Sequence, residues 1–309
     1  MPLKEPIQVV INAGAGANDK DEVVRRLAEL YPADDRRCRI SVVKSGPDLV
    51  ELTARAVKEN YQTIIAGGGD GTVSSVAGVL VGTDRILGVL PLGTLNHFAK
   101  DLHIPIDLEG AMKTIVASHT MQVDVGEVNG RVFLNNSSLG LYPKIVRERE
   151  KQQRLGWGKW PAFVWAAVSV LRRYPLLDVR LSVDEAEFAR RTPFVFVGNN
   201  EYEMESFNIG ARPCLDKGEL SLYITHRTGR LGLMRLALRA LFGGLRKESD
   251  FTAMCTKEVW IKTRHRRLRV ALDGEITVVE PPLHYRVRPG ALRVIAPAPA
   301  HESGKQIEE

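Results

Sequence analysis

The chain has 309 residues, of which 44% are hydrophobic and 26% are charged, so it is long and apolar enough to bury more than one core. Its three cysteines are far apart and odd in number, which argues against a disulfide framework and for a reducing compartment. The N-terminus lacks a signal-peptide pattern, and the longest apolar stretch, residues 161–171, is too short to span a bilayer. We therefore expect a cytoplasmic protein that associates with a membrane peripherally or not at all.

The net charge of +6 is unevenly distributed along the chain. Residues 226–269 hold twelve Lys or Arg and only three Asp or Glu. Such a segment suggests an anionic partner, which could be a membrane surface, a nucleic acid or a phosphorylated ligand. A basic face exposed to solvent is the simpler alternative.

The first 120 residues alternate between strand and helix patterns. Apolar runs predict strands, and amphipathic spacing predicts helices. The expected strands are residues 7–12, 39–44, 63–67 and 85–91, and the expected helices are 21–31, 48–59 and 72–80. This alternation predicts a parallel sheet with helices on both faces, which binds ligands at the carboxyl ends of its strands.

After about residue 120 the pattern becomes a succession of short strands. Asn129-Gly130 separates two alternating runs and predicts a β-hairpin. Further strands are expected at 177–184, 192–199, 218–226, 258–264, 268–274, 276–280, 283–289 and 291–297. Helical insertions are expected at about 141–173 and 229–246.

The fold class that follows is α/β with a second, all-β part. We expect an N-terminal parallel-sheet nucleotide-binding domain over residues 1–127. A mainly antiparallel β-sandwich with helical insertions should follow over residues 128–297. Residues 298–309 read as a flexible tail.

Asp70 lies in the sequence IIAGGGDGTVSS, where a strand pattern meets a helix pattern. Thr72 is expected to cap the helix. Four glycines allow positive φ and let a ligand approach the backbone closely: Gly67, Gly68, Gly69 and Gly71. Backbone N–H groups at such a helix start favour phosphate, and Asp70 suits a metal ion or a proton acceptor. A tight turn with a solvated aspartate is the alternative.

Three other turns at strand ends carry weaker signals. They contain Asn12, Gly14 and Gly16; Gly93, Thr94 and Asn96; and Asp273 and Glu275. The first two belong to the α/β half, where the sheet should place them beside the Asp70 turn. A lone Asp-Gly-Glu is most often a β-turn without further function.

Together the motifs GGGDGT, PLGTLNHFAKDL, VDVGEVNGRVFLNNSSLG and the late DGE resemble the diacylglycerol kinase catalytic-domain family. The likeness runs from about residue 7 to about 297. It implies an NAD kinase-like fold in which an α/β domain binds ATP and a β-sandwich forms the other wall of a cleft. It also implies Mg²⁺-dependent transfer of the ATP γ-phosphoryl group to a lipid hydroxyl, and a role in phospholipid metabolism.

The resemblance also implies roles for individual residues. The nucleotide would contact Asn12, Gly16, Gly67, Gly68, Gly69, Gly71, Thr72, Gly93, Thr94 and Asn96. Metal ligands would be Asp70, Asp124, Glu275 and, in a structural site, Asp216, although Leu215 replaces an acidic residue of that segment. We expect Asp273 to be the base and Asp70 to be the second candidate, with Glu275 as catalytic residue or metal ligand.

Two segments bear on the lipid. Residues 229–246 read as a basic amphipathic helix that suits an anionic membrane, or alternatively as a helix packed on the sandwich. The tryptophan-rich segment 156–173 suits an acyl channel or core packing equally. The identity of the lipid stays open, and so does the oligomeric state, with a homodimer among the alternatives.

Three other functions compete with a lipid kinase. An NAD kinase-type enzyme shares GGDGT but has a different second glycine motif. A non-catalytic lipid- or nucleotide-binding protein would have no need of Asp70, Asp273 and Glu275. A nucleic-acid binder would explain the basic segment, but no nucleic-acid motif accompanies it, so we expect no nucleic-acid partner.

Overall fold

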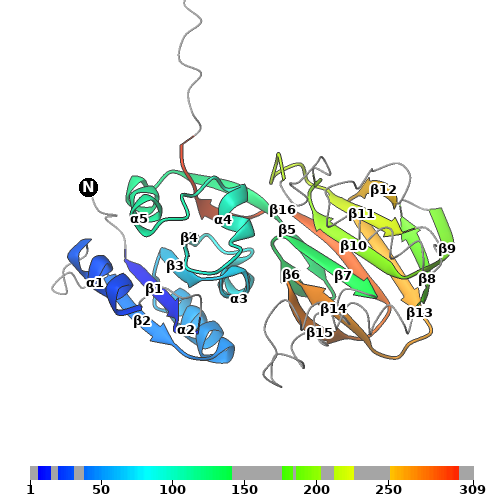
Figure 1. The fold of residues 1–309 in the computed structure, drawn as a ribbon, viewed down its shortest axis with the longest axis horizontal. Coiled ribbons are helices and arrows are strands. Elements are labelled where there is room, and N and C mark those ends of the chain that lie inside the picture. The colour runs from blue at the N-terminus through cyan, green and yellow to red at the C-terminus, as the bar shows by residue number, and fades with distance from the viewer. Residues whose placement is uncertain are drawn as a thin grey trace, which may run out of the picture. The chain divides into compact units, whose positions relative to one another are not determined.

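The computed structural model describes residues 6–14, 20–30, 38–140, 176–183, 186–202, 212–225 and 251–298. The chain divides into two compact units (Figure 1). Unit 1 comprises Met1–Val73, Asp84–Gln122 and Arg293–Glu309, and unit 2 comprises Ser74–Thr83 and Val123–Leu292. This division differs from the two continuous ranges expected, because helix α3 (Asp70–Leu80) and strand β16 (Leu283–Ile295) each contribute residues to both units.

Unit 1 contains the expected parallel sheet. Its strands are β1 (Ile7–Asn12), β2 (Cys38–Val43), β3 (Thr63–Gly68) and β4 (Ile86–Pro91), in the order β2-β1-β3-β4. All three pairings are parallel. Every residue of β3 is buried, as is typical of a central strand covered on both faces. Arg293 and Val294 at the end of β16 add a short parallel pairing to β4.

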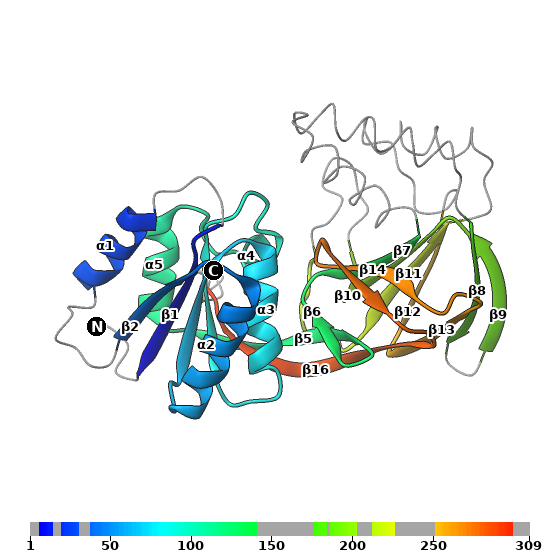
Figure 2. The same cartoon turned by 90° about the horizontal axis from the view of Figure 1, so that it is seen from below.

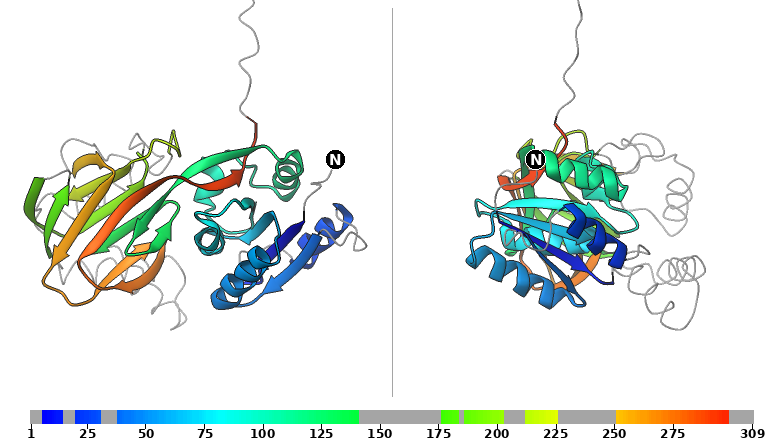
Figure 3. Two further views of the ribbon diagram at one scale, coloured as in Figure 1. Left: turned by 180° about the vertical axis from the view of Figure 1, so that it is seen from behind. Right: turned by 90° about the vertical axis from the view of Figure 1, so that its left-hand side faces the viewer.

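Helices cover both faces of this sheet. They are α1 (Lys20–Leu30), α2 (Gly46–Lys58), the first turn of α3, α4 (His97–Asp101) and α5 (Leu108–Ala117). Helices α1 and α5 lie on one face and α2 lies on the other (Figure 2; Figure 3, right). Helix α2 has an N-cap at Ser45, whose side chain accepts the Asp48 N–H. The α/β architecture predicted from the alternating pattern is confirmed, although α5 was not among the expected helices.

Unit 2 contains two antiparallel sheets. The first has β5 (Thr120–Val128), β6 (Arg131–Phe133), β8 (Leu177–Val183), β9 (Ala186–Thr192), β13 (Glu258–Thr263) and β16. In it β16, β13, β8 and β9 lie side by side (Figure 3, left). The second has β7 (Asn136–Gly140), β10 (Phe194–Asn199), β11 (Leu220–Thr225), β12 (Phe251–Thr256), β14 (Leu268–Leu272) and β15 (Glu275–Val279). Its order is β12-β11-β10-β7-β14-β15.

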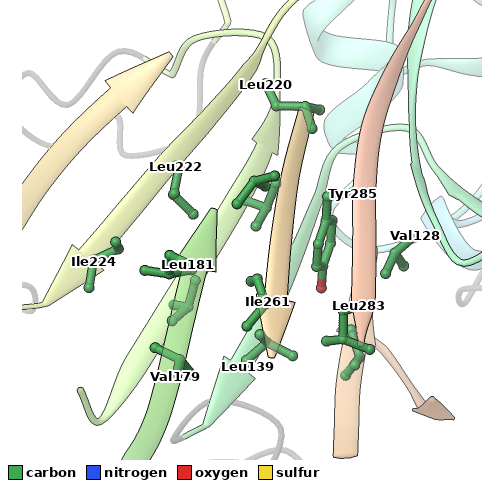
Figure 4. Packing of buried hydrophobic residues seen from close by; sticks show 14 of the residues in the cluster. Val128, Leu139, Val179, Leu181, Leu220, Leu222, Ile224, Ile261, Leu283 and Tyr285 are labelled. Carbon is green, nitrogen blue, oxygen red and sulfur yellow. The ribbon is translucent and has the colours of Figure 1, made fainter. Parts of the chain in front are cut away.

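One apolar core joins the two sheets of unit 2 (Figure 4). Strand β8 alternates buried and less buried residues, so Val179 and Leu181 point inward. They meet Leu139 and Leu222 of the other sheet in the same buried cluster. Alternating inward residues on two facing sheets are the pattern of a β-sandwich, and the predicted sandwich is confirmed.

The two-residue hairpin expected at Asn129-Gly130 is confirmed. Asn129 has φ 47° and Gly130 has φ 79°, and Val128 pairs with Arg131. Positive φ at both central positions is the type I′ geometry, which Asn-Gly favours. The strand after this turn is not continuous, however, because β6 and β7 belong to different sheets.

Other boundaries differ from expectation. The two strands predicted at 283–289 and 291–297 are one strand, β16, while β9 and β12 were not predicted because their polar residues obscure the alternation. The insertions expected at 141–173 and 229–246 lie outside the described residues, as does the tail beyond residue 298. Within the described part of the chain, no helix is long and apolar enough to cross a membrane.

Candidate active site

The segment Gly67–Thr72 joins β3 to α3. β3 continues through Gly68 and α3 begins at Asp70, so Thr72 lies inside the first turn and the expected capping role for it is wrong. None of the four glycines has a positive φ, so the freedom that glycine allows is not used in this segment. The helix starts early enough that the chain needs no left-handed residue to enter it.

Glycine is required in this segment for space. A Cβ atom on Gly68 would lie 2.4 Å from Oγ1 of Thr72, and one on Gly93 would lie 2.4 Å from Cα of Gly69. The β3–α3 loop and the β4–α4 loop therefore pack backbone against backbone, as the parallel sheet predicts. The result is a surface with few side chains at the carboxyl ends of two neighbouring strands.

Polar side chains fix these loops. Asn12 at the end of β1 donates from Nδ2 to Thr72 Oγ1 at 2.9 Å, and its Oδ1 accepts the Gly14 N–H at 2.9 Å. Asn96 is 4% exposed and left-handed at φ 52°, and its amide bonds the backbone of Gly93 and Pro91. Thr94 is exposed. The structure thus brings the expected nucleotide residues of unit 1 together, except Gly16, which lies outside the described residues.

Asp70 is the first residue of α3 and is half-buried. Its Oδ1 accepts the Phe98 N–H at the start of α4, at 3.3 Å. One carboxylate oxygen makes no hydrogen bond within the described residues, so it can still take a ligand. The carboxylate lies at the N-terminal end of α3.

Asp273 and Gly274 form the two-residue turn between β14 and β15. Their φ angles are 46° and 86°, and Leu272 pairs with Glu275, so this is a second type I′ hairpin. The turn reading of the Asp-Gly-Glu motif is therefore correct. It is also incomplete, because the Asp273 side chain does more than shape the turn.

The Asp273 carboxylate accepts four hydrogen bonds within unit 2. Oδ1 accepts the N–H groups of Asn135 and Asn136 at 2.8 and 3.0 Å. Oδ2 accepts the Leu134 N–H at 2.8 Å and the Ser74 hydroxyl of α3 at 2.5 Å. Residues 134–136 are where the chain passes from β6 to β7. Asp273 therefore fixes the segment that crosses from one sheet of unit 2 to the other, and it also bonds Ser74 of α3.

Burial raises the pKa of Asp273 above its ordinary value, while the hydrogen bonds from Ser74 and the three backbone N–H groups oppose that rise. Four donors occupy the lone pairs of both oxygens, so this carboxylate is a poor proton acceptor. The arrangement fits a positioning role better than the role of base expected for Asp273.

Glu275 differs from Asp273 in its surroundings. It is the first residue of β15 and is exposed, and its side chain makes no hydrogen bond or ion pair within the described part of the chain. Partial burial of the carboxyl group raises its pKa, and the nearby charge of Asp273 raises it further. Glu275 is thus an available carboxylate whose pKa is shifted toward neutrality.

Arg212 belongs to the same network, although nothing in the sequence singled it out. It is 4% exposed, and its guanidinium donates to the Leu134 carbonyl at 2.6 Å and to Asn135 Oδ1 at 2.8 Å. It also donates to the Asn199 carbonyl. Arg212 therefore bonds oxygen atoms of Leu134 and Asn135, in the same segment whose N–H groups Asp273 accepts. A lone arginine has no spacing or composition signal that could have revealed this.

Asp124 is 2% exposed and binds backbone from two distant segments. Its Oδ2 accepts the Gly218 N–H at 2.6 Å, and its Oδ1 accepts the Gly290 N–H at 2.8 Å. The metal-ligand role expected for Asp124 stays a prediction, but both of its oxygens already stabilise the fold.

Replacing Asp124 by alanine should lower the free energy of unfolding by about 3 kcal/mol, because two buried N–H groups lose their acceptor. Asp178→Ala is the control, since the Asp178 side chain is 63% exposed. Urea unfolding of both variants measures the difference. An Asp124→Ala protein as stable as Asp178→Ala would show that these two hydrogen bonds contribute little.

The structural metal site near Asp216 has little support in the geometry. Asp216 is exposed, and Leu215 is buried with its carbonyl accepting the Asp124 N–H. Among the described residues, a cluster of three potential ligands occurs at Glu201, Glu219 and Cys255, and does not include Asp216.

Comparison with known proteins identifies the family. A family model described as the diacylglycerol kinase catalytic domain matches residues 6–128. A second, described as the YegS C-terminal NAD kinase beta sandwich-like domain, matches residues 143–296. The diacylglycerol kinases of Staphylococcus aureus strains RF122 and MRSA252 are each 30% identical over 245 residues, which cover 77% of this chain and 76% of theirs.

A crystal structure of a diacylglycerol kinase from Bacillus anthracis strain Sterne shares the fold. It has a TM-score of 0.69 at 22% identity and covers 95% of this chain and 97% of its own. The sequence matches extend through both the glycine-loop region and the sandwich. The chain therefore belongs to the diacylglycerol kinase family, a family of lipid kinases.

Proposed function

We propose that this protein transfers the γ-phosphoryl group of ATP to the hydroxyl group of a membrane lipid, diacylglycerol or a similar lipid alcohol. The observation that carries the proposal is the close backbone packing of the two glycine loops beside Asp70, in a member of this family. Such a surface admits phosphate groups to backbone N–H donors.

Unit 1 fits a nucleotide and Mg²⁺. The loops lack Cβ atoms at Gly68, Gly69 and Gly93, and Asp70 keeps one oxygen for a hard cation. Asn12 and Thr72 fix the first loop, while Asn96 fixes the second. Mg²⁺ would supply charge neutralisation on the transferring phosphoryl group.

Glu275 is the residue we assign to the lipid hydroxyl proton. An acceptor must have an accessible lone pair and a pKa nearer to neutrality than an ordinary carboxylate. Glu275 meets both conditions, whereas the lone pairs of Asp273 are occupied. In this assignment Asp273 positions the turn that precedes Glu275, and Asp70 binds the metal.

The proposed activity is tested by incubating the protein with radiolabelled ATP, Mg²⁺ and a total lipid extract. Mass spectrometry of the labelled product then identifies the acceptor. A labelled lipid that disappears when Mg²⁺ is chelated supports the proposal. If label enters only NAD or another soluble metabolite, the protein is not a lipid kinase.

Asp70→Asn should reduce kcat at least about a hundredfold, because it removes a charge that binds the metal or the reacting group. The fold should persist, since Asn can still accept the Phe98 N–H. Asp84→Asn, at a side chain 80% exposed, is the control. Near wild-type turnover by a folded Asp70→Asn enzyme would contradict the metal assignment.

A further inference from the structure

The turn between β13 and β14 exposes an unbroken series of basic side chains. Residues 262–269, here called the basic turn, contain no Asp or Glu. Their exposed side chains include Lys262, Arg264, His265, Arg266, Arg267 and Arg269. Only Leu268 in this stretch is buried, where it joins the sandwich core.

Few of these charges are neutralised. Lys262 lies 3.6 Å from Glu187 and Arg267 lies 3.3 Å from Glu280, and all four side chains are more than half exposed. Exposed pairs of this kind attract weakly. Arg264, Arg266 and Arg269 have no ion pair within the described residues. The basic turn therefore produces a positive potential at this end of the sandwich.

The neighbouring strands add to the same end. Arg180 of β8 pairs in register with Lys262 and is exposed. On the next strand, β9, Arg190 lies opposite the buried Val179 and so points to the other face of the sheet, while Arg191 pairs with Asp178. The positive surface therefore extends from the turn to Lys262 of β13 and Arg180 of β8.

Two segments of the chain also join the sandwich at this end. Strand register places Gly140 beside Phe194, and Val195 beside Ile224, so β7 and β11 both finish there. Residues 226–250, which follow β11, contain six Lys or Arg and two Asp or Glu. The basic segment that follows β11 is thus attached to the end of unit 2 at which β14 begins after the basic turn.

We propose that this end of unit 2, formed by the basic turn with Arg180, docks on the anionic surface of a phospholipid bilayer. Charge complementarity selects an anionic partner. The choice of a bilayer over another polyanion rests on the proposed function, because a lipid kinase must meet its acceptor at a membrane.

The docking surface is separate from the residues assigned to the reaction. Arg269, the last residue of the basic turn, is the second residue of β14, and Asp273 follows the end of that strand. At about 3.4 Å per residue, Arg269 and Asp273 lie about 14 Å apart along the strand. Substitutions in the basic turn should therefore leave the hydrogen bonds of Asp273 unchanged.

The test is binding of the full chain to vesicles of phosphatidylglycerol and phosphatidylcholine, measured by co-sedimentation. The variant combines Arg264→Gln, Arg266→Gln and Arg269→Gln. The matched control combines Arg25→Gln, Arg26→Gln and Arg55→Gln, which removes the same charge from exposed positions on α1 and α2. Thermal unfolding of both proteins verifies that they are folded.

We expect the basic-turn variant to bind about a hundredfold more weakly, because three basic side chains each contribute a factor of about five at an anionic surface. The control should bind almost as well as wild type. Wild-type binding should weaken as salt rises and should be absent with pure phosphatidylcholine vesicles.

Several outcomes would overturn the proposal. They are failure of the wild type to bind anionic vesicles, unchanged binding by the basic-turn variant, and equal weakening in the control. Binding to duplex DNA is measured in parallel. If the basic-turn variant loses DNA binding but still binds anionic vesicles, the surface belongs to nucleic acid instead. The measurement needs no catalysis, so a protein that binds as expected but phosphorylates no lipid would refute the proposed function and leave the docking surface standing.

Discussion

Replacing Asp273 by alanine should lower the free energy of unfolding by about 3 kcal/mol or more and eliminate kinase activity at the same time. The variant leaves the N–H groups of residues 134–136 and the Ser74 hydroxyl without their acceptor. Leu134 and Asn135 are buried, so water cannot easily replace the lost carboxylate. Chemical unfolding and a lipid phosphorylation assay measure the two losses.

Two matched variants separate the turn from the hydrogen bonds. Asn serves a type I′ turn as well as Asp does, so Asp273→Asn preserves the backbone but presents an NH₂ group to at least one backbone donor. It should therefore be destabilised, though less than Asp273→Ala. Ser74→Ala removes only one of the four bonds and should cost about 1 to 3 kcal/mol. If Asp273→Asn has the stability of wild type, Asp273 is only a turn residue.

Loss of activity in Asp273→Ala would follow from position rather than from proton transfer. Asp273 precedes Glu275 by two residues, and it bonds Ser74, which lies one helical turn after Asp70 in α3. Both assigned functional carboxylates thus depend on elements that Asp273 holds. The steep dependence of catalysis on geometry makes a small displacement costly.

The parts of this fold that follow from local sequence were predictable. Asn129-Gly130 specifies its hairpin because both positions must adopt positive φ, and few residues tolerate that. The strands of unit 1 follow from continuous apolar runs, which parallel strands require on both faces. In each case the signal lies within a few residues of the structure that it determines.

Features that depend on distant segments were missed. The packing that requires glycine at positions 68 and 93 was not predicted: the Thr72 side chain and the Gly69 backbone occupy the space that a Cβ atom would take. The break between β6 and β7 depends on Asp273 and Arg212, which lie 139 and 78 residues away from Leu134. No window of local sequence contains that information.

In the candidate site, too, the local sequence indicates which residues matter, whereas their roles depend on distant segments. Asp70, Asp273 and Glu275 were recognised by resemblance, but their roles could not be separated, because all three are carboxylates in glycine-containing turns. The separation comes from counting hydrogen bonds, which are four for Asp273 and one for Asp70. Asp124 is a similar case, since its acceptor role toward Gly218 and Gly290 is visible only in three dimensions.

Glu275→Gln should reduce kcat by about a thousandfold while leaving the stability of the protein unchanged. Gln has the same size but cannot accept the lipid hydroxyl proton. Stability should persist because Glu275 is exposed and its side chain makes no hydrogen bond within the described residues. Glu280→Gln, an exposed position just after the same strand, is the control and should keep full activity.

The pH profile distinguishes a proton acceptor from a metal ligand. Burial and the Asp273 charge raise the pKa of Glu275, and only the ionised carboxylate accepts a proton. Activity should therefore fall as the pH drops through a value above the ordinary glutamate pKa of about 4.3. In a folded Asp273→Asn enzyme the neighbouring charge is gone, so any residual activity should fall off at a lower pH than in wild type. Rescue of Glu275→Gln by added Mg²⁺, or an unshifted pH profile in Asp273→Asn, would contradict this assignment. Glu275 would then be a metal ligand, and Asp70 would be the proton acceptor.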